Sequence, residues 1–392
     1  MIKFGIVGFG LAATVFHIPL IQLAAAVGKP ASISALYSSK SVADIHATLP
    51  NTAVFSDINV FMQEADMDVV VIVTPNEFHY DIAKRALLAK KHVVIDKPFV
   101  CNYAEGQELI KLAQQQGKQL TVYHNRRWDG DFLTIQALQQ QQVFGEIRYF
   151  ESRFDKYRPT ITTRWKEQDA PGTGLLFDIG SHLIDQALTL FGQPDSVSAT
   201  LLNSRDGAVA NDYFDIQLSF NQQRQLARLR GSSYGSNSPF RFYIEGSNAS
   251  FQKSHLDVQE AQLRAAISQP QQSIKHIADT LGVEPIEHYG RLNLHCSDNL
   301  PASANYHAGE QTIATERGRY HSFYDNLIAV LVQERLKAQI DTARLAPQTS
   351  SHNETSQSTL SVTAQQALNV IKVIELAQTS AQQGRRVEFS LD

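Results

Sequence analysis

Near the N-terminus an apolar segment rich in β-branched residues, Ile2–Val7, leads directly into Gly8-Phe9-Gly10-Leu11-Ala12-Ala13. This G-x-G-x-x-A pattern lies between a predicted strand and a predicted helix over residues 12–26, which is the context that a dinucleotide-binding turn requires. Gly8 allows a tight turn, Gly10 allows the backbone to approach a pyrophosphate, and Ala13 allows close packing of helix on strand. The free N–H groups at the start of the helix attract phosphates. We therefore predict dinucleotide binding at residues 8–12, with a purely structural turn as the alternative.

The first 125 residues alternate between short apolar segments and helix-like segments. The predicted strands cover residues 2–7, 32–37, 69–73, 92–95 and 119–123. The predicted helices between them cover residues 12–26, 41–49, 58–64, 76–89 and 103–116. Continuous apolar strands that alternate with helices indicate a parallel sheet with both faces covered, wound in both directions from its centre. We predict an α/β Rossmann domain with a doubly wound parallel sheet over residues 1–125.

Beyond residue 125 many segments alternate apolar and polar residues, which is typical of strands with one buried and one wet face. The predicted strands cover residues 146–155, 195–203, 212–220, 225–231 and 240–245. The predicted helices cover residues 132–142, 181–191, 320–337 and 364–381. Thr363 and Gln366 form a predicted capping box before the last helix. We predict an α+β substrate-binding and oligomerisation domain over residues 126–392, with an open, mostly antiparallel sheet and a mobile loop at 343–360.

Composition excludes several classes of function. The chain has 35 Lys and Arg against 39 Asp and Glu, a net charge of −4, which argues against a nucleic-acid partner. Only 2 cysteines are present, which argues against a disulfide scaffold, a thiolate zinc cluster and an iron–sulfur site. No apolar stretch is long enough to span a membrane, and the N-terminus is a poor signal peptide. We expect a cytoplasmic protein without a metal or a membrane partner.

The end of the second predicted strand bears on the choice of dinucleotide. An NAD-specific domain usually places an acidic residue there, which accepts from the ribose 2′-hydroxyl. This chain instead has Ser38, Ser39 and Lys40, and its first carboxylate is Asp44 in the next helix. Hydroxyls and an ammonium suit a 2′-phosphate, although a helix cap and a solvated lysine are the alternative. We predict NADP as the cofactor and regard NAD as less favoured.

Two further segments carry groups suited to acid–base chemistry. Lys97 ends the fifth predicted strand before Pro98, and ligands of open parallel sheets bind at the carboxyl ends of strands. Asp178, His182 and Asp185 are spaced four and three apart, so they share one face if the segment is helical. Burying such groups without a purpose is costly, although a structural cluster remains an alternative. A metal site is disfavoured because no second His or Cys lies at ligand spacing.

These motifs together resemble a known family. The glycine turn, Asp96-Lys97-Pro98 and the D-x-G-x-H-x-x-D pattern of residues 178–185 resemble the glucose–fructose oxidoreductase and inositol dehydrogenase (Gfo/Idh/MocA) family over almost the whole chain. Segments 15–17, 125–132 and 154–159 narrow the resemblance to the branch that contains NADP-dependent scyllo-inositol dehydrogenases. Asp96 is a departure, because the family usually has Glu at this position.

The resemblance implies a role for each matching residue. Lys97 contacts the nicotinamide side and the substrate hydroxyl, His182 is the general acid and base, and Asp178 is its partner and a substrate contact. Asp185 is a further polar contact. Other residues implied to lie at the cofactor are Thr74, Pro75, Asn76, His79, Asp96, Asn125 and Trp165. We expect the ring hydroxyls of a substrate to be bound by Arg127, Tyr157 and Arg158.

The sequence thus predicts an NADP-dependent oxidoreductase that transfers a hydride between the nicotinamide and a secondary hydroxyl or ketone of a cyclic polyol or sugar, such as scyllo-inositol. Two alternatives stay open, a non-catalytic NADP-binding regulatory protein and a glycosidase of the same family that uses a tightly held NAD. An open sheet leaves a broad face to cover, so we also expect a homodimer, or a tetramer.

Overall fold

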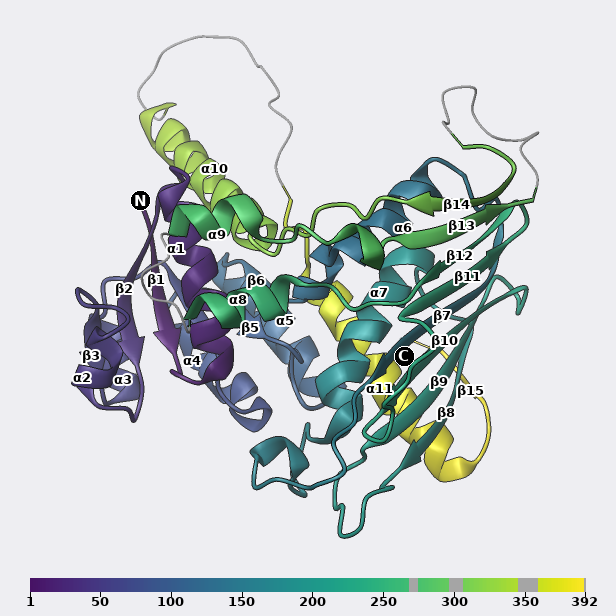
Figure 1. Cartoon of the computed structure of the whole chain (residues 1–392). Helices are drawn as coiled ribbons and strands as arrows, with labels where there is room; N and C mark the ends of the chain where they lie inside the picture. The colour runs from purple at the N-terminus through teal and green to yellow at the C-terminus, as the bar shows by residue number, and fades with distance from the viewer. Residues whose placement is uncertain (268–273, 296–305, 345–358, 391–392) are drawn as a thin grey trace.

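The computed structural model describes residues 1–267, 274–295, 306–344 and 359–390. Its strands form two sheets (Figure 1). The first sheet has six strands in the order β3-β2-β1-β4-β5-β6, and the second has nine in the order β14-β13-β12-β11-β7-β10-β9-β8-β15. The first sheet is built from the N-terminal part of the chain, and the second from the part that follows.

The first sheet is parallel throughout, as predicted. Its strands are β1 (Ile2–Val7), β2 (Ala31–Tyr37), β3 (Ala53–Phe55), β4 (Val69–Ile72), β5 (His92–Asp96) and β6 (Leu120–Tyr123). The connecting helices are α1 (Ile18–Ala26), α2 (Val42–His46), α3 (Ile58–Glu64), α4 (His79–Leu88) and α5 (Tyr103–Gln116). All four residues of β4 are buried, because helices cover both faces of the sheet. Strand β3 was not predicted, since it has three residues and none of them is fully buried.

The second sheet is mostly antiparallel, as predicted, and only β7 and β10 run parallel to each other. Its strands are β7 (Ile147–Asp155), β8 (Ser196–Leu202), β9 (Tyr213–Phe220), β10 (Gln225–Ser232), β11 (Phe242–Gly246), β12 (Ala249–Lys253), β13 (Gly290–Leu294), β14 (Gly309–Ile313) and β15 (Val387–Glu388). Strands β12 to β15 lie outside the predicted segments. The helices α6 (Gly130–Gln140), α7 (Ser181–Phe191) and α11 (Ala364–Gln383) lie on one face (Figure 1). The predicted capping box at Thr363 is present.

The C-terminal part of the chain serves both sheets. Helix α10 (Ser322–Arg344) packs against β1 and α1, where Tyr324 and Leu327 are buried beside the first sheet. Helix α11 instead packs against α5, α7 and β8, between the two sheets. The domain boundary after residue 125 stays a prediction: the first sheet ends at Tyr123, and residues from α10 return to it. Most of the loop predicted at 343–360 lies outside the described residues. Helices α8 (Gln259–Ile267) and α9 (Ile274–Thr280) follow β12 and lie outside the predicted segments.

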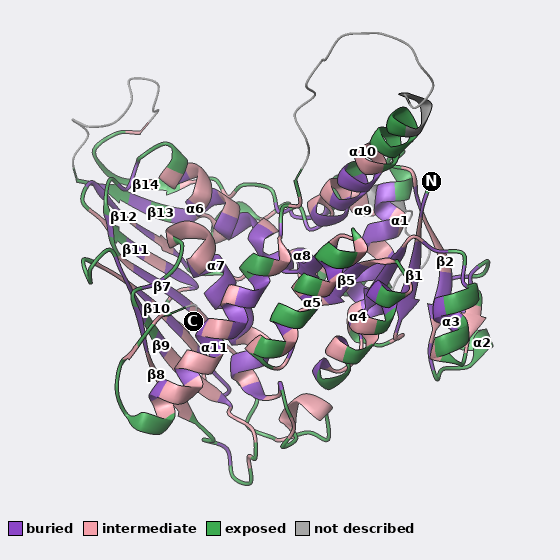
Figure 2. Ribbon diagram, turned by 180° about the vertical axis from the view of Figure 1, so that it is seen from behind, coloured by how far each residue is buried: buried purple, intermediate pink, exposed green. Residues whose placement is uncertain are grey.

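A continuous apolar core fixes the two sheets relative to each other. One cluster of buried side chains includes Val93 of the first sheet, Leu109 of α5, Leu368 of α11 and Phe214 of the second sheet. The buried residues run along the inner layers of the molecule (Figure 2). In the described part of the chain no helix is long and apolar enough to cross a membrane. Cytoplasmic location and association through the open face of the second sheet stay predictions.

Candidate active site

The glycine turn lies at the carboxyl end of β1 and is closed against the neighbouring strand β4. Gly8 has φ +105°, and a Cβ placed on it would lie 2.6 Å from the carbonyl oxygen of Val73, so only glycine fits here. A Cβ on Gly10 would meet nothing within 4 Å, and Leu11 is 60% exposed. The Thr74 Oγ1 atom is buried without a hydrogen-bond partner among the described residues. The turn therefore presents open backbone and an unused hydroxyl, which fits a bound dinucleotide.

The end of β2 carries no carboxylate in the structure either. Ser38 is buried, and its hydroxyl accepts from the Lys40 backbone N–H at 3.1 Å, while the side chains of Ser39 and Lys40 are exposed. The cap of α2 is Ser41, whose hydroxyl accepts from the Asp44 N–H. Ser38 and Ser39 are therefore not the cap of α2, whereas the exposed Lys40 still agrees with the alternative of a solvated lysine.

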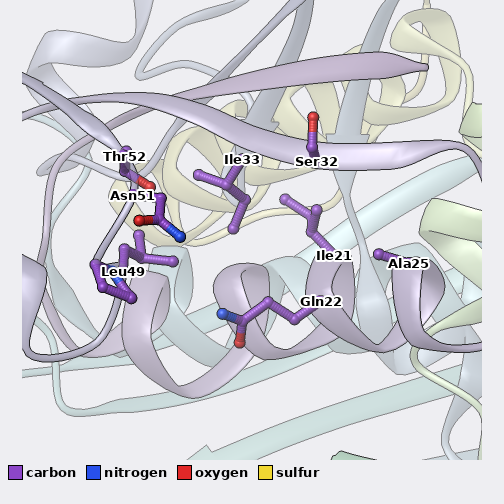
Figure 3. Close-up of a pocket in the computed structure, with 9 residues that line it drawn as sticks. Ile21, Gln22, Ala25, Ser32, Ile33, Leu49, Asn51 and Thr52 are labelled. Carbon is purple, nitrogen blue, oxygen red and sulfur yellow. The ribbon is translucent and has the colours of Figure 1, made fainter.

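A cavity of about 460 Å³ lies between the glycine turn and the second sheet. The predicted site residues that line it are Leu11, Ala12, Asp96, Lys97, Asn125, Arg158, Trp165, Asp178 and His182. A smaller hollow of about 180 Å³ lies between α1, β2 and the segment at Leu49 (Figure 3). No titratable side chain lines this hollow. A third pocket of about 310 Å³ has charged residues in its wall, among them Arg317, His321 and Asp325, but none of the predicted site residues.

Three charged side chains meet in the cavity. The Nζ atom of Lys97 lies 2.9 Å from Oδ1 of Asp178, and the Nζ atom of Lys166 lies 2.5 Å from the same oxygen. Burial lowers the pKa of Lys97, and although the Asp178 charge opposes this, the ammonium of Lys166 adds to the lowering. Burial alone would raise the pKa of Asp178, but the two lysines outweigh it and hold that carboxyl ionised. The side chain of Lys97, which directly follows the last residue of β5, is thus held in place by Asp178.

His182 lines the same cavity as the second residue of α7. Its Nδ1 atom is buried and has no hydrogen-bond partner in the part of the chain that the structure describes. Burial lowers the pKa of His182 well below its ordinary value, and the charges of Lys97 and Arg126 lower it further. The ring is therefore neutral at physiological pH, which is the form that can accept a proton.

Asp178 and His182 are not hydrogen-bonded to each other, although the resemblance implies that they are partners. Asp178 lies in the π-helical turn Leu176–Gly180, which precedes α7. Its hydrogen bonds go to Lys97 and Lys166, and it has none with the ring of His182. The prediction of a regular helical face is wrong here, because the wider turn ends between the two residues.

Asp185 and Arg127 lie outside the residues that line the cavity. The Nε and Nη2 atoms of Arg127 donate to the two carboxylate oxygens of Asp185 at 2.8 and 2.7 Å, and both side chains are buried. Arg127 also donates to the carbonyl of Ser361 and to Gln366, so it ties α7 to the start of α11. The role of Arg127 and Asp185 as substrate contacts stays a prediction. In the structure the two residues form a buried ion pair that holds α7 against the start of α11.

Replacing Asp185 by asparagine is expected to destabilise the fold by about 3–5 kcal/mol, because the buried guanidinium of Arg127 loses its counter-charge. Chemical unfolding of the purified variant measures this. The double variant Arg127→Met with Asp185→Leu is the control, and it should recover much of the loss. Unchanged stability together with a large rise in KM would instead show that the pair binds substrate.

Two further residues that were predicted to lie at the cofactor, His79 and Asn76, form hydrogen bonds to neighbouring loops. His79 is fully buried, with Nδ1 2.9 Å from the Pro98 carbonyl and Nε2 3.1 Å from the Thr74 carbonyl, so it connects the loops after β4 and β5. Asn76, which follows Pro75, donates to the Gly172 carbonyl at 2.6 Å. These residues hold the loops in place rather than line the cavity.

Asp96 lines the cavity, whereas Tyr157 lies outside its wall. Tyr157 is 61% exposed beside Tyr234 and does not line the cavity. Asp96 Oδ1 accepts from the Lys97 backbone N–H at 3.0 Å and lies 3.5 Å from His17 Nε2. Burial would raise the pKa of Asp96, but the His17 ring and Lys97 lower it. Asp96 therefore fixes the backbone of the lysine that follows it.

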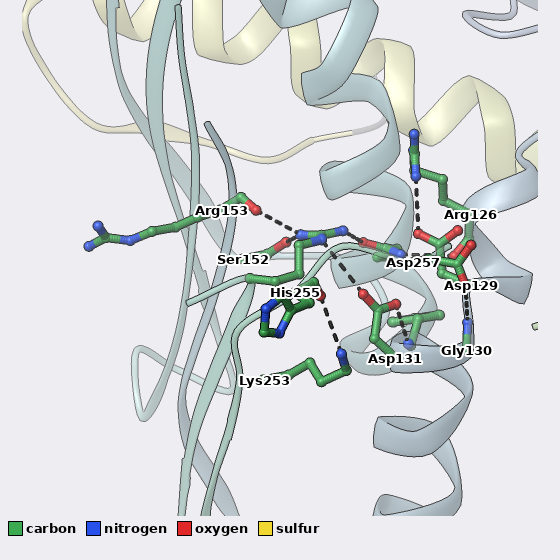
Figure 4. A network of polar contacts seen from close by, with 12 residues as sticks. Arg126, Asp129, Gly130, Asp131, Ser152, Arg153, Lys253, His255 and Asp257 are labelled. Atoms are coloured by element: carbon green, nitrogen blue, oxygen red, sulfur yellow. Dashed lines mark hydrogen bonds and ion pairs between the residues drawn. The ribbon is translucent and has the colours of Figure 1, made fainter. Parts of the chain in front are cut away.

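Sequence reasoning missed several residues of the cavity wall. Arg126 is the clearest: its guanidinium lies 3.3 Å from Asp129 and 3.0 Å from Glu260. Behind it, the N–H of Gly130 donates to Asp257 at 2.8 Å, in a buried polar network (Figure 4). The Glu260 partner lies 134 positions away in the chain, so no local spacing signals the contact.

Family models match both parts of the chain. The model described as the oxidoreductase family, NAD-binding Rossmann fold, matches residues 2–124, and that of the C-terminal alpha/beta domain of the same family matches residues 137–344. The chain belongs to the GFO_IDH_MocA oxidoreductase family. It is therefore an oxidoreductase with an NAD(P)-binding Rossmann domain and a mixed-sheet second domain, and the resemblance drawn from the motifs is confirmed.

Relatives in this family match nearly the full chain. The scyllo-inositol 2-dehydrogenase (NADP(+)) IolW of Bacillus subtilis is 32% identical over 387 residues, 98% of this chain and 95% of that protein. The oxidoreductase YdgJ of Escherichia coli is 41% identical over 271 residues, 69% of this chain and 76% of that protein. The solved structure of the oxidoreductase yvaA of Bacillus subtilis superposes with a TM-score of 0.82 at 31% identity, covering 99% of this chain and 98% of that one.

Proposed function

We propose that this oxidoreductase transfers a hydride between NADP and a secondary hydroxyl or ketone of a cyclic polyol or sugar of the scyllo-inositol type. The observation that carries the proposal is the convergence of Lys97, Asp178 and His182 on one cavity beside the glycine turn. A neutral imidazole and a fixed ammonium are the two groups that alcohol oxidation needs, a proton acceptor and a stabiliser of negative charge on oxygen.

NADP bound at the glycine turn would supply the hydride chemistry of the proposed reaction. His182 takes the hydroxyl proton at Nε2, because its Nδ1 is buried. Lys97 donates a hydrogen bond to the same substrate oxygen and stabilises the charge that develops as the proton leaves. Asp178 keeps Lys97 in place through its Oδ1 atom. Trp165 and Arg158, which also line the cavity, contact the rest of the substrate and its ring hydroxyls.

The choice of NADP rests on Ser38, Ser39 and Lys40, since no carboxylate would repel a 2′-phosphate at the end of β2. The NADP dependence stated in the name of IolW supports it. Among substrates, the scyllo-inositol in that name supports a cyclic polyol as the first compound to test.

Replacing Lys40 by glutamate is expected to raise the KM for NADP about 10- to 100-fold and to change that for NAD much less, because a charged contact to the 2′-phosphate becomes a repulsion. Steady-state kinetics with both cofactors measures the ratio. The control is Lys111→Glu, which makes the same charge change at an exposed position of α5. Equal effects of the two variants on NADP would contradict the proposed phosphate site.

A further inference from the structure

Lys166 shares one carboxylate oxygen with Lys97. Both ammonium groups lie against Oδ1 of Asp178, at 2.5 Å for Lys166 and 2.9 Å for Lys97. The Lys97 ammonium is also bonded to the Asp178 carbonyl oxygen. Two lysines facing one carboxylate leave an excess positive charge at the cavity wall. The Lys166 side chain is 41% exposed, and an ion pair at such a position contributes little to stability.

The segment that carries Lys166 is held from its other side. The short turn Trp165–Glu167 places Trp165 and Lys166 on the cavity, and Glu167 lies 3.0 Å from Arg205. Arg205 in turn lies 2.8 Å from Asp212, which directly precedes β9, and both of these side chains are buried. The backbone turn Trp165–Glu167 is therefore anchored to the second sheet. This anchoring fixes the position from which the Lys166 side chain contacts Asp178.

We propose that Lys166 is a second lysine of the reaction centre, a positioning residue that holds the Asp178 carboxylate together with Lys97 and so directs the Lys97 ammonium at the substrate oxygen. This proposal rests on the proposed function. With Lys166 in place, Asp178 is fixed by one ion pair from each domain, so the ammonium of Lys97 stays aligned. Without Lys166, the carboxylate is free to turn toward Lys97 alone and draw its ammonium away from the substrate.

The positive charge of Lys166 also lowers the pKa of His182. The groups that lower the pKa of His182, after burial itself, are Lys97, Arg126, His124 and Lys166. Asp178 lies four residues before His182 in the chain. For Lys166, burial opposes its charge, and the attraction of Asp178 outweighs this and raises its pKa. Lys166 is thus charged over the whole working range of pH, and it helps to keep the His182 ring neutral.

The test compares Lys166→Met with Lys166→Arg and with Lys84→Met. The last variant removes an exposed lysine from its 2.7 Å pair with Glu108 and is the control. With NADP and the polyol that the wild type oxidises best, Lys166→Met should lose about tenfold in kcat, the scale of one charge-assisted hydrogen bond, with a smaller change in KM. The acid limb of its kcat/KM profile should move to higher pH, because His182 loses a neighbouring positive charge. Lys166→Arg should restore both.

A second measurement needs no turnover. In protein labelled with carbon-13 at histidine Cε1, the His182 resonance, assigned by its loss in His182→Gln, should titrate at higher pH in Lys166→Met than in wild type. If no polyol is oxidised but this shift appears, the proposed function fails, and the placement of the Lys166 charge beside Asp178 and His182 stands. If the titration, the kcat and the acid limb all match those of wild type and of Lys84→Met, the proposal is overturned.

Discussion

Replacing Lys97 by methionine is expected to lower kcat at least about a hundredfold while the protein still binds NADPH. Methionine keeps the unbranched shape of the side chain, so the loss isolates the ammonium group. Removing one preorganised donor to a developing oxyanion typically costs about 10²–10³ in kcat. Lys97 is the donor in question, because its side chain is only 13% exposed and is held by Asp178. Steady-state kinetics and NADPH fluorescence titration together separate chemistry from binding.

The same charge can be removed far from the cavity as a control. Lys84→Met deletes an exposed lysine beside Glu108 and should leave kcat within twofold of wild type. Circular dichroism of both variants shows whether the fold is intact. A Lys97→Met enzyme with full activity would rule out any part for this ammonium in the reaction.

Replacing His182 by glutamine is expected to reduce kcat by about 10²–10⁴, the usual contribution of a positioned general base. Glutamine fills similar space in the buried position but cannot take up a proton near neutral pH. Single-turnover measurement of NADPH formation reports the chemical step directly. A loss confined to KM would show that His182 binds substrate without moving a proton.

The pH dependence of the wild type tests the same residue. Burial first, and then Lys97, lower the pKa of His182 below its ordinary value of 6.5, and the base acts in its neutral form. Activity is therefore expected to be flat at neutral pH and to fall only as the pH drops through that lowered pKa. His182→Gln should lack this acid limb, so a limb that persists in the variant would assign it to another group.

Much of the fold could be predicted because its signals are local. The buried runs of the first sheet and the alternation along β9 follow directly from the sequence. The turn at Gly8 could also be predicted, since only a glycine tolerates φ +105° against the Val73 carbonyl. Strand β15 could not, because a two-residue strand at the edge of the sheet carries no periodicity.

The sequence predicted which residues line the site better than it predicted which of them contact each other. Lys97 and His182 line one cavity as the motifs imply. A regular helix was assumed for Asp178, and the π-helical turn that the structure has there depends on packing rather than on residue type. Lys166 was missed because its contact with Asp178 crosses an irregular segment, where spacing carries no information about distance.

The central claim is tested most directly by following the hydride itself. A cyclic polyol deuterated at its ring carbons, scyllo-inositol first, is incubated with the protein and NADP, and the nicotinamide is examined by mass spectrometry and proton NMR. The account predicts NADPH that carries one deuterium at C4, formed in equal amount with the ketone. NADPH that binds tightly, with no deuterium transferred from any polyol or sugar tested, would contradict it.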